Sequence, residues 1–348
     1  MNAAGLKPTY LRPLPALIAL ALLVAAGLIG VLVGPVALRS ADVVGELVDR
    51  LPLLDVSSGM TEREAAILWQ LRVLRVVLGG VVGGTLAVAG AAYQGVFRNA
   101  LADPYLLGVA AGAGLGATIV IAYVPAEGWP IDPVPVAAFA GALVAVAVTY
   151  ALGRSGARSR TATTLILAGV AVASFFTAVQ TYVQQRESDT LQQVYAWILG
   201  QLGTAGWSEV RLVLPYAALS WIAILLHRRL LDVLSVGDEE ADSLGIRAGR
   251  VRLLVVVAAS LGTAAAVAVG GLIAFVGIIV PHTLRLVIGS SYRVLLPMSV
   301  LFGAAFLILA DLLARTVVAP AELPIGVITA FFGAPFFLLV LRTARRMS

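Results

Sequence analysis

The stretch VVLGGVVGGTLAVAGAAY, residues 76–93, runs without a single charged residue. It is long enough to cross most of the hydrocarbon core of a bilayer as a helix. Gly79-Gly80 and Gly83-Gly84 form two overlapping G-x-x-x-G pairs. Such pairs let helix backbones approach closely in lipid, where packing replaces the hydrophobic driving force. The stretch therefore predicts a transmembrane helix that lies against other helices.

The rest of the chain repeats this character. Hydrophobic residues make up 60% of the 348 residues, charged residues 12%, and the mean hydropathy is +0.98. Soluble domains carry about a quarter charged residues, so this composition is that of a membrane protein. We expect an all-α polytopic membrane protein with about ten transmembrane helices. The predicted spans are residues 13–34, 70–92, 104–124, 133–152, 162–184, 210–227, 251–269, 271–288, 294–313 and 323–341.

Several kinds of chemistry are excluded by composition. The chain has no cysteine, which excludes disulfides, thiolate catalysis and cysteine-ligated metals. Its only lysine is Lys7, so it has no phosphate-binding P-loop, and any work done with ATP requires a partner. His227 and His282 lack metal-ligand spacing, and no metal site is expected. The net charge of +5 does not indicate nucleic-acid binding, because each charge acts on one side of a membrane.

The distribution of basic residues predicts the orientation. Most of the 24 Lys and Arg fall in segments that are cytoplasmic if the N-terminus is inside, and acidic residues favour the other side. An even number of spans returns the C-terminus to the same side. Both termini are therefore expected in the cytoplasm, with residues 1–12 as a tail and residues 13–348 as a single transmembrane domain.

One cytoplasmic connection, residues 98–108, has more structure in its sequence than a plain linker. Pro104 interrupts a continuous helix, and Asn99 and Asp103 can accept hydrogen bonds from the freed amides. Irregular backbone at membrane depth survives only when it is buried in protein or lines a wet cavity. A tight turn and a constriction of a pathway both remain open for this segment.

Two other connections also predict local structure. Within residues 234–247, Asp238 suits the positive end of a short helix and Gly245 stops it. A helix of about two turns is not stable alone, so it either docks on a partner or lies solvated on the surface. On the outer side, residues 188–207 contain Trp197 and Trp207, which are typical of the headgroup belt.

Three longer motifs occur in a fixed order: VAGAAYQGVFRNALADPYLLG at 88–108, LIAFVGIIVPH at 272–282 and ELPIGVITAFFGAPFF at 322–337. Together they resemble the FecCD-type permeases, the membrane subunits of type II ABC importers for ferric siderophores, haem and vitamin B12. The resemblance runs from about residue 67 to the C-terminus. Ala100 departs from it, because the family usually has proline there, and we expect a looser turn at this point.

The resemblance implies a BtuC-like permease fold with ten helices per subunit and a homodimer around a central pathway. It also implies two cytoplasmic ATPases, which bind the ATP, and an extracytoplasmic binding protein, with no cofactor in the permease itself. Three groups of residues take roles by this resemblance. They are Arg72, Arg75 and Arg315 for docking of the binding protein; Asn99, Leu101, Thr163 and Thr164 for an inner gate; and Gly237, Asp238, Glu240, Ala241, Leu244 and Gly245, within a coupling loop at about 234–250, for contact with the ATPase.

These three arginines fall in predicted outer segments, against the general charge trend, and nothing near Arg72 and Arg75 in sequence neutralises them. An arginine fork pairs well with the carboxylates of a partner. The alternative is that they snorkel to headgroup phosphates of the membrane lipid.

The leading hypothesis is a permease subunit in the bacterial cytoplasmic (inner) membrane that moves an iron chelate, a ferric siderophore, by alternating access. Vitamin B12 and haem are the alternative cargoes. An ion-coupled secondary transporter is disfavoured, since the predicted span centres lack Lys, Arg, Asp and Glu. An intramembrane enzyme would need a convergent nucleophile or metal set, which the sequence does not indicate. The polar, uncharged candidates for the pathway are Tyr93, Gln94, Gln180 and Gln184.

Overall fold

The computed structural model describes residues 11, 13–50, 59–125, 129, 131–154 and 162–345, and these are helical almost throughout. Nearly all of the predicted N-terminal tail, residues 1–12, lies outside the described residues. The longer helices are α1 (Pro13–Leu32), α4 (Leu74–Phe97), α5 (Val109–Tyr123), α6 (Pro133–Arg154), α7 (Ala162–Arg186), α9 (Trp207–Leu226), α12 (Ala248–Gly270), α13 (Val276–Ile288), α14 (Tyr292–Thr316) and α15 (Ile325–Arg345). The shorter ones are α2 (Ser40–Asp49), α3 (Glu62–Ile67), the π-helix η1 (Leu68–Val73), the 3-10 helices η2 (Pro104–Leu107) and η3 (Ser188–Thr190), α8 (Leu191–Ile198), α10 (Arg228–Val236) and α11 (Asp238–Ser243).

Within the described residues, seven helices are long and apolar enough to cross a membrane, and three apolar helices are shorter. The seven include a continuous helical stretch, Glu62–Phe97, made of α3, η1 and α4. The three shorter ones are α5, α13 and most of α15. Together they occupy the ten predicted spans, which confirms the all-α membrane fold.

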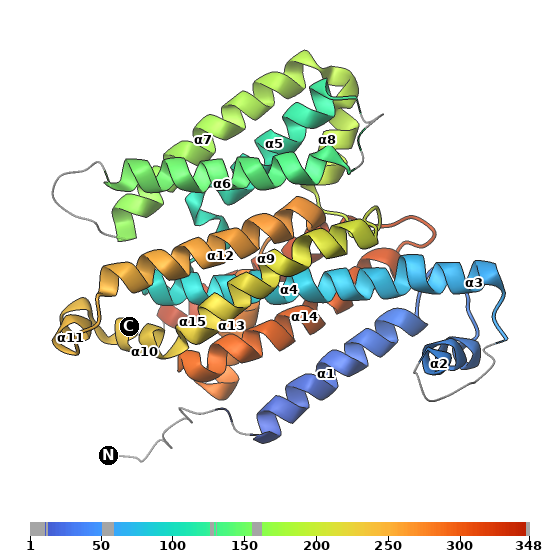
Figure 1. The fold of residues 1–348 in the computed structure, drawn as a ribbon, viewed down its shortest axis with the longest axis horizontal. Coiled ribbons are helices and arrows are strands. Elements are labelled where there is room, and N and C mark those ends of the chain that lie inside the picture. Colours follow the sequence, from blue (N-terminus) through green and yellow to red (C-terminus); the bar gives the residue numbers. More distant parts are fainter. Residues whose placement is uncertain are drawn as a thin grey trace.

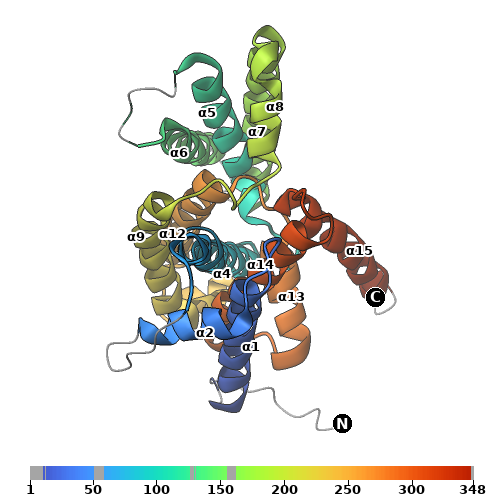
Figure 2. The same ribbon diagram turned by 90° about the vertical axis from the view of Figure 1, so that its right-hand side faces the viewer.

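Helix α4 runs through the middle of the bundle (Figures 1 and 2) and packs against α9, α12, α13 and α14. Helix α1 lies outside α14, while α5, α6 and α7 form a second layer on α12. The two ends of the bundle are named here by their short helices. The α3 end carries α2 and α3, and the α11 end carries α10 and α11 (Figure 1).

Small residues set the closest helix crossings. A Cβ on Gly83 would lie 2.3 Å from the carbonyl oxygen of Gly303, and one on Gly112 would lie 2.3 Å from that of Gly141. At Gly79 and Gly80 the same atom would make ordinary contacts of 3.5 and 3.6 Å. The packing expected from the glycine spacing is therefore confirmed, but only some of the glycines are required by backbone contact.

The eighth predicted span, 271–288, is wrong in its first part, because residues 271–275 form no helix and α13 begins at Val276. Gly271 has a φ of +71° and lies against the carbonyl oxygen of Trp197. The Tyr105 hydroxyl donates to the Ile273 carbonyl at 2.9 Å and accepts from the Ile273 amide at 3.1 Å. This side chain satisfies backbone groups that a helix would otherwise pair, as irregular backbone inside a membrane protein requires.

Candidate functional site

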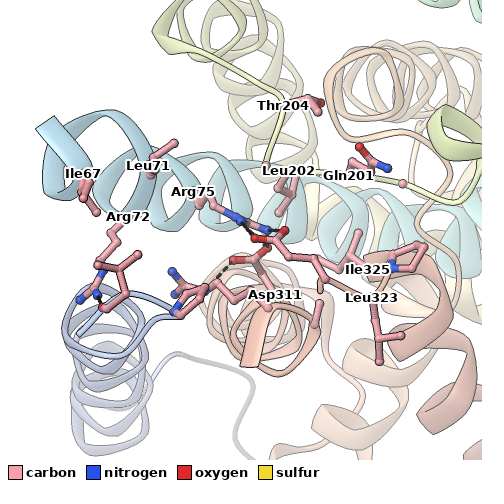
Figure 3. A pocket seen from close by; sticks show the side chains of 18 residues that line it. Ile67, Leu71, Arg72, Arg75, Gln201, Leu202, Thr204, Asp311, Leu323 and Ile325 are labelled. Carbon is pink, nitrogen blue, oxygen red and sulfur yellow. Dashed lines mark hydrogen bonds and ion pairs between the residues drawn. The ribbon is translucent and has the colours of Figure 1, made fainter. Parts of the chain in front are cut away.

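At the α3 end, a cavity of about 370 Å³ is lined by η1, α4, the loop 200–204, the end of α14 and the start of α15 (Figure 3). It brings together the three arginines singled out in the sequence with two carboxylates: Arg72, Arg75, Arg315, Asp311 and Glu322. We call these five residues the arginine cluster.

Arg75 contacts both carboxylates of the cluster. Its Nη1 and Nη2 donate to Glu322 Oε1 and Oε2, both at 2.8 Å, in a two-pronged pair. Its Nε and Nη2 also donate to Asp311 Oδ1 at 3.3 and 3.1 Å (Figure 3). Gly203 makes room for the guanidinium, since a Cβ there would lie 3.1 Å from Arg75 Nη1. Arg75 is thus held by two carboxylates and satisfied by charge-assisted hydrogen bonds.

The other two arginines are buried, with exposed fractions of 3% for Arg72 and 2% for Arg315. Arg315 Nε lies 3.4 Å from Asp311 Oδ2, one helical turn away on α14, and its Nη2 donates to the Gly30 carbonyl. Arg72 donates through Nη1 to the carbonyls of Val31 and Leu32, at 2.9 and 2.8 Å, where α1 ends. A cation at a helix C-terminus pairs with carbonyls that have no helical partner.

The π-helix η1 explains why Arg72 and Arg75 point in different directions (Figure 3). Three residues apart on an α-helix, they would share a face. Wider π turns are often found at functional sites. Here Arg72 lies in η1 and reaches α1, while Arg75 lies in the following α-helix and reaches α14.

These contacts pair Arg75 and Arg315 with carboxylates, whereas Arg72 donates to backbone carbonyls. Asp311 and Glu322 lie 236 and 247 residues beyond Arg75 in sequence, so local inspection missed them. One signal was available, because Asp311 and Arg315 have the i, i+4 spacing of an ion pair on one helix. Of the two carboxylates Glu322 is the more exposed, at 40% of its side chain, and its hydrogen bond with Arg75 lowers its pKa.

At the α11 end, α4 ends at Phe97 and is capped by Arg98. The turn that follows is closed by hydrogen bonds to Asn99, in contrast to the looser turn expected from Ala100. The Asn99 side-chain oxygen accepts from the Leu101 amide at 2.9 Å, and Asp103 accepts from the Tyr105 amide at 2.7 Å. Burial raises the pKa of Asp103 to about 6, although the Tyr105 amide acts in the opposite direction. The capping expected from the sequence is confirmed. Asn99 is exposed and Leu101 half-buried, so the turn also stays a candidate gate.

The two threonines of the predicted gate, Thr163 and Thr164, lie in the first turn of α7. This helix packs against η2, the 3-10 helix that follows the Asn99 turn. The approach is closest at Gly169, where a Cβ would lie 2.1 Å from the Leu106 carbonyl oxygen. The structure thus places α7 against η2, and the gate role of Thr163 and Thr164 stays a prediction.

The expected short helix is present as α11, Asp238–Ser243. Gly245 has a φ of +75°, and the Ile246 amide donates back to the Ala241 carbonyl at 3.0 Å, which closes the helix end. Ala241 is fully buried, whereas Leu244, which follows the last residue of α11, is 67% exposed. The side chain of Glu240 lies against Gly237. The structure confirms the short helix, and its docking on a partner stays a prediction.

Two of the four pathway candidates do not face the outside of the subunit. Tyr93 is fully buried and hydrogen-bonds to Ser260, and Gln94 is 1% exposed and donates to the Gly277 carbonyl at 3.0 Å. Both hold α4 to its neighbours in this structure, and their role as pathway residues stays a prediction. Gln180 is buried against Gly114 and Gln184 is half-buried.

The exposed polar side chains of α7 were missed by the sequence analysis. Ser174, Thr177 and Thr181 are exposed on this helix, and Tyr182 is 61% exposed. Ser174 and Thr181 donate to backbone carbonyls four residues earlier, which makes them compatible with an apolar setting. The one available signal was their spacing, which places hydroxyls on a common side of the helix.

Comparison with known proteins gives consistent results. The FecCD transport family matches residues 22–343. The cobalamin import system permease protein BtuC of Halobacterium salinarum is 42% identical over 284 residues, which is 82% of this chain and 75% of that protein. The hemin transport system permease protein HmuU of Yersinia pestis is 42% identical, over 80% of this chain and 84% of that protein. A solved structure, described as an inward-facing metal-chelate type ABC transporter, has a TM-score of 0.82 and 26% identity, covering 95% of this chain and all of that one.

A bundle of apolar helices with these matches defines a permease, the membrane-spanning subunit of an ABC importer. The chain belongs to the FecCD transport family. The fold class and family expected from the three motifs are thereby confirmed.

Proposed function

We propose that the protein carries an iron chelate inward across the cytoplasmic membrane by alternating access, driven by partner ATPases. The observation that carries this proposal is α11, an exposed short helix tied to the turn at Asn99, within a permease of this family. The relatives named for cobalamin and hemin support a large metal chelate as cargo. Haem and vitamin B12 remain the alternative cargoes.

We propose that the α11 end faces the cytoplasm and the α3 end the exterior. In Figure 1, α1 begins and α15 ends toward the α11 end, as expected for termini on one side. Arg98, Arg228, Arg229, Arg250, Arg252 and Arg293 also lie toward that end of their helices. An excess of arginine at one end is typical of the cytoplasmic side.

We propose that two copies assemble across α7, with the pathway between them. Only 17% of the apolar part of the stretch Thr163–Arg186, which is nearly all of α7, is buried, against 72% for the stretch Glu62–Phe97, which contains α4. The exposed side chains of Ser174, Thr177, Thr181 and Tyr182 place polar atoms on the side of α7 that a second copy would cover. A homodimer would cover the helix and enclose these groups.

The test of this function is reconstitution into proteoliposomes with the cognate ATPase and binding protein. We expect uptake of one chelate among a ferric siderophore, haem and cobalamin, and we expect it to require ATP hydrolysis. An ATPase variant that binds but does not hydrolyse ATP should abolish it. Uptake that persists without the ATPase and follows an ion gradient would contradict the proposal and support a secondary transporter.

We further propose that the binding protein docks at the arginine cluster by exchanging carboxylates. Arg72 and Arg315 are buried, so Arg75 is the arginine that an incoming acid can reach. Glu322 already accepts hydrogen bonds from both terminal nitrogens of Arg75, and it is the more exposed partner of this ion pair. A carboxylate of the binding protein would have to displace Glu322, which makes Glu322 an internal competitor for docking.

The variant Glu322→Gln is therefore expected to strengthen association with the binding protein by about 3- to 10-fold at low salt, mainly through the on-rate. Surface plasmon resonance on the permease in nanodiscs measures this. Glu62→Gln on α3 removes the same charge from an exposed position at the same end and should change association less. The gain should shrink at high ionic strength because screening weakens the steering. Weaker association of the Glu322 variant would contradict the exchange.

A further inference from the structure

At the α11 end, one residue contacts both the candidate gate turn and the candidate docking helix. Arg98 ends α4 with a φ of 48°, a left-handed conformation that glycine adopts easily and arginine rarely does. It is followed directly by Asn99, which closes the turn to Leu101. Backbone strain of this kind persists only where surrounding contacts hold it. The contacts of the Arg98 side chain are therefore informative.

That side chain reaches across to α10 and α11. Its Nε donates to the Leu234 carbonyl at 2.8 Å, and its Nη2 pairs with the Asp238 carboxylate at the start of α11. Arg252 of α12 donates to the same Asp238 oxygen at 2.8 Å. One carboxylate on the docking helix is thus bound by arginines from two long helices of the bundle.

The two short helices are held very differently. Helix α10 is anchored by the buried side chains of Leu231 and Leu234, and Asp232 accepts from the Tyr292 amide at 2.6 Å. Helix α11 has six residues and buries only Ala241. Its main tie to the bundle is therefore Asp238, and a push on α11 would act first on that carboxylate.

The ion pair has little to contribute to stability. The side chains of Arg98 and Asp238 are 38% and 47% exposed, and pairs this exposed add little to folding. The hydrogen bond from Arg98 Nε to the Leu234 carbonyl of the anchored α10 holds the strained backbone, and the exposed pair with Asp238 adds a contact to α11 rather than stability. We infer that Arg98 is a positioning residue that transmits displacement of α11 to the turn at residues 99–101. This inference rests on the proposed function.

The experiment compares Arg98→Gly and Arg98→Ala with the parent in the assembled complex in proteoliposomes. Glycine removes the side chain and relieves the backbone, whereas alanine removes the side chain alone. The readouts are the ATP hydrolysis rate, uptake per ATP, and the mobility of a spin label at Leu101→Cys, since the chain has no other cysteine. Arg229→Ala, an exposed arginine on α10, is the matched control.

We expect both Arg98 variants to assemble and hydrolyse ATP, with uptake per ATP reduced at least 10-fold. The Leu101 label should lose its response to nucleotide. Asp238→Asn should behave likewise, and combining it with Arg98→Gly should add little, as for two partners of one contact. Arg229→Ala should match the parent.

Normal uptake per ATP and a normal label response in both Arg98 variants would overturn the inference. Normal uptake per ATP in Arg98→Gly together with reduced uptake per ATP in Arg98→Ala would also overturn it. The second pattern would assign the effect to backbone strain. Failure of the proposed function can be told apart from failure of this inference, because the parent protein itself would then show no ATP-driven uptake.

Discussion

Replacing Asp311 with alanine is expected to destabilise the protein by about 3–5 kcal/mol, the cost of leaving a buried charge without its partner. Asp311 is 2% exposed and binds Arg75 through Oδ1 and Arg315 through Oδ2. Arg75 keeps Glu322 in the variant, but Arg315 loses its only carboxylate among the described residues. Most of the lost stability therefore comes from the unpaired buried charge of Arg315.

The measurement is thermal inactivation of the purified permease in detergent, followed as the half-life at a fixed temperature, because large membrane proteins often unfold irreversibly. Glu322→Gln serves as the control and should cost less than about 1 kcal/mol, since its partly exposed pair is screened by water. The double variant Asp311→Leu with Arg315→Met removes both charges of this buried pair and should recover at least half of the loss. An Asp311→Ala protein as durable as the parent would contradict this account.

The membrane spans were predictable because they depend on local composition. Ten apolar stretches are visible in the sequence, and an apolar helix of the structure lies in each. The errors occur where distant residues decide the backbone. Residues 271–275 are apolar enough to continue a helix, yet they are held open by Tyr105 and lie against Trp197. Periodicity carries no information about such long-range partners.

The position of the candidate site could be predicted from the sequence, but the partners and the burial of its residues could not. The outer location of Arg72, Arg75 and Arg315 followed from the charge map and the family resemblance, and the structure gathers all three at one end of the bundle. The neutralisation of Arg75 depends on Asp311 and on Glu322, which lies in the segment between α14 and α15. The direction of Arg72 depends on a π turn that no sequence pattern indicated. Similarly, Tyr93 and Gln94 have the polarity of pathway residues, but hydrogen bonds to α12 and α13 bury them.

The glycines of α4 offer a stringent test of the packing. A Cβ on Gly90 would lie 2.1 Å from the Gly277 carbonyl oxygen and 2.5 Å from its Cα, so α13 cannot approach α4 at its present distance if residue 90 is alanine. Backbone atoms cannot rotate away as a flexible side chain does. Gly90→Ala is therefore expected to cost about 3 kcal/mol or more, at the upper end for overpacking.

Gly80→Ala makes the same chemical change in the same helix and is the matched control. Its Cβ would lie 3.6 Å from the Ile308 side chain, an ordinary contact. Alanine also favours helix over glycine by up to about 1 kcal/mol, so this variant should be neutral or slightly stabilised. Thermal inactivation in detergent compares the two. Equal half-lives of the two variants would contradict the backbone contact between α4 and α13. A shortened half-life in Gly90→Ala alone would show that the backbone of Gly277, directly opposite Gly90, sets the distance between these helices.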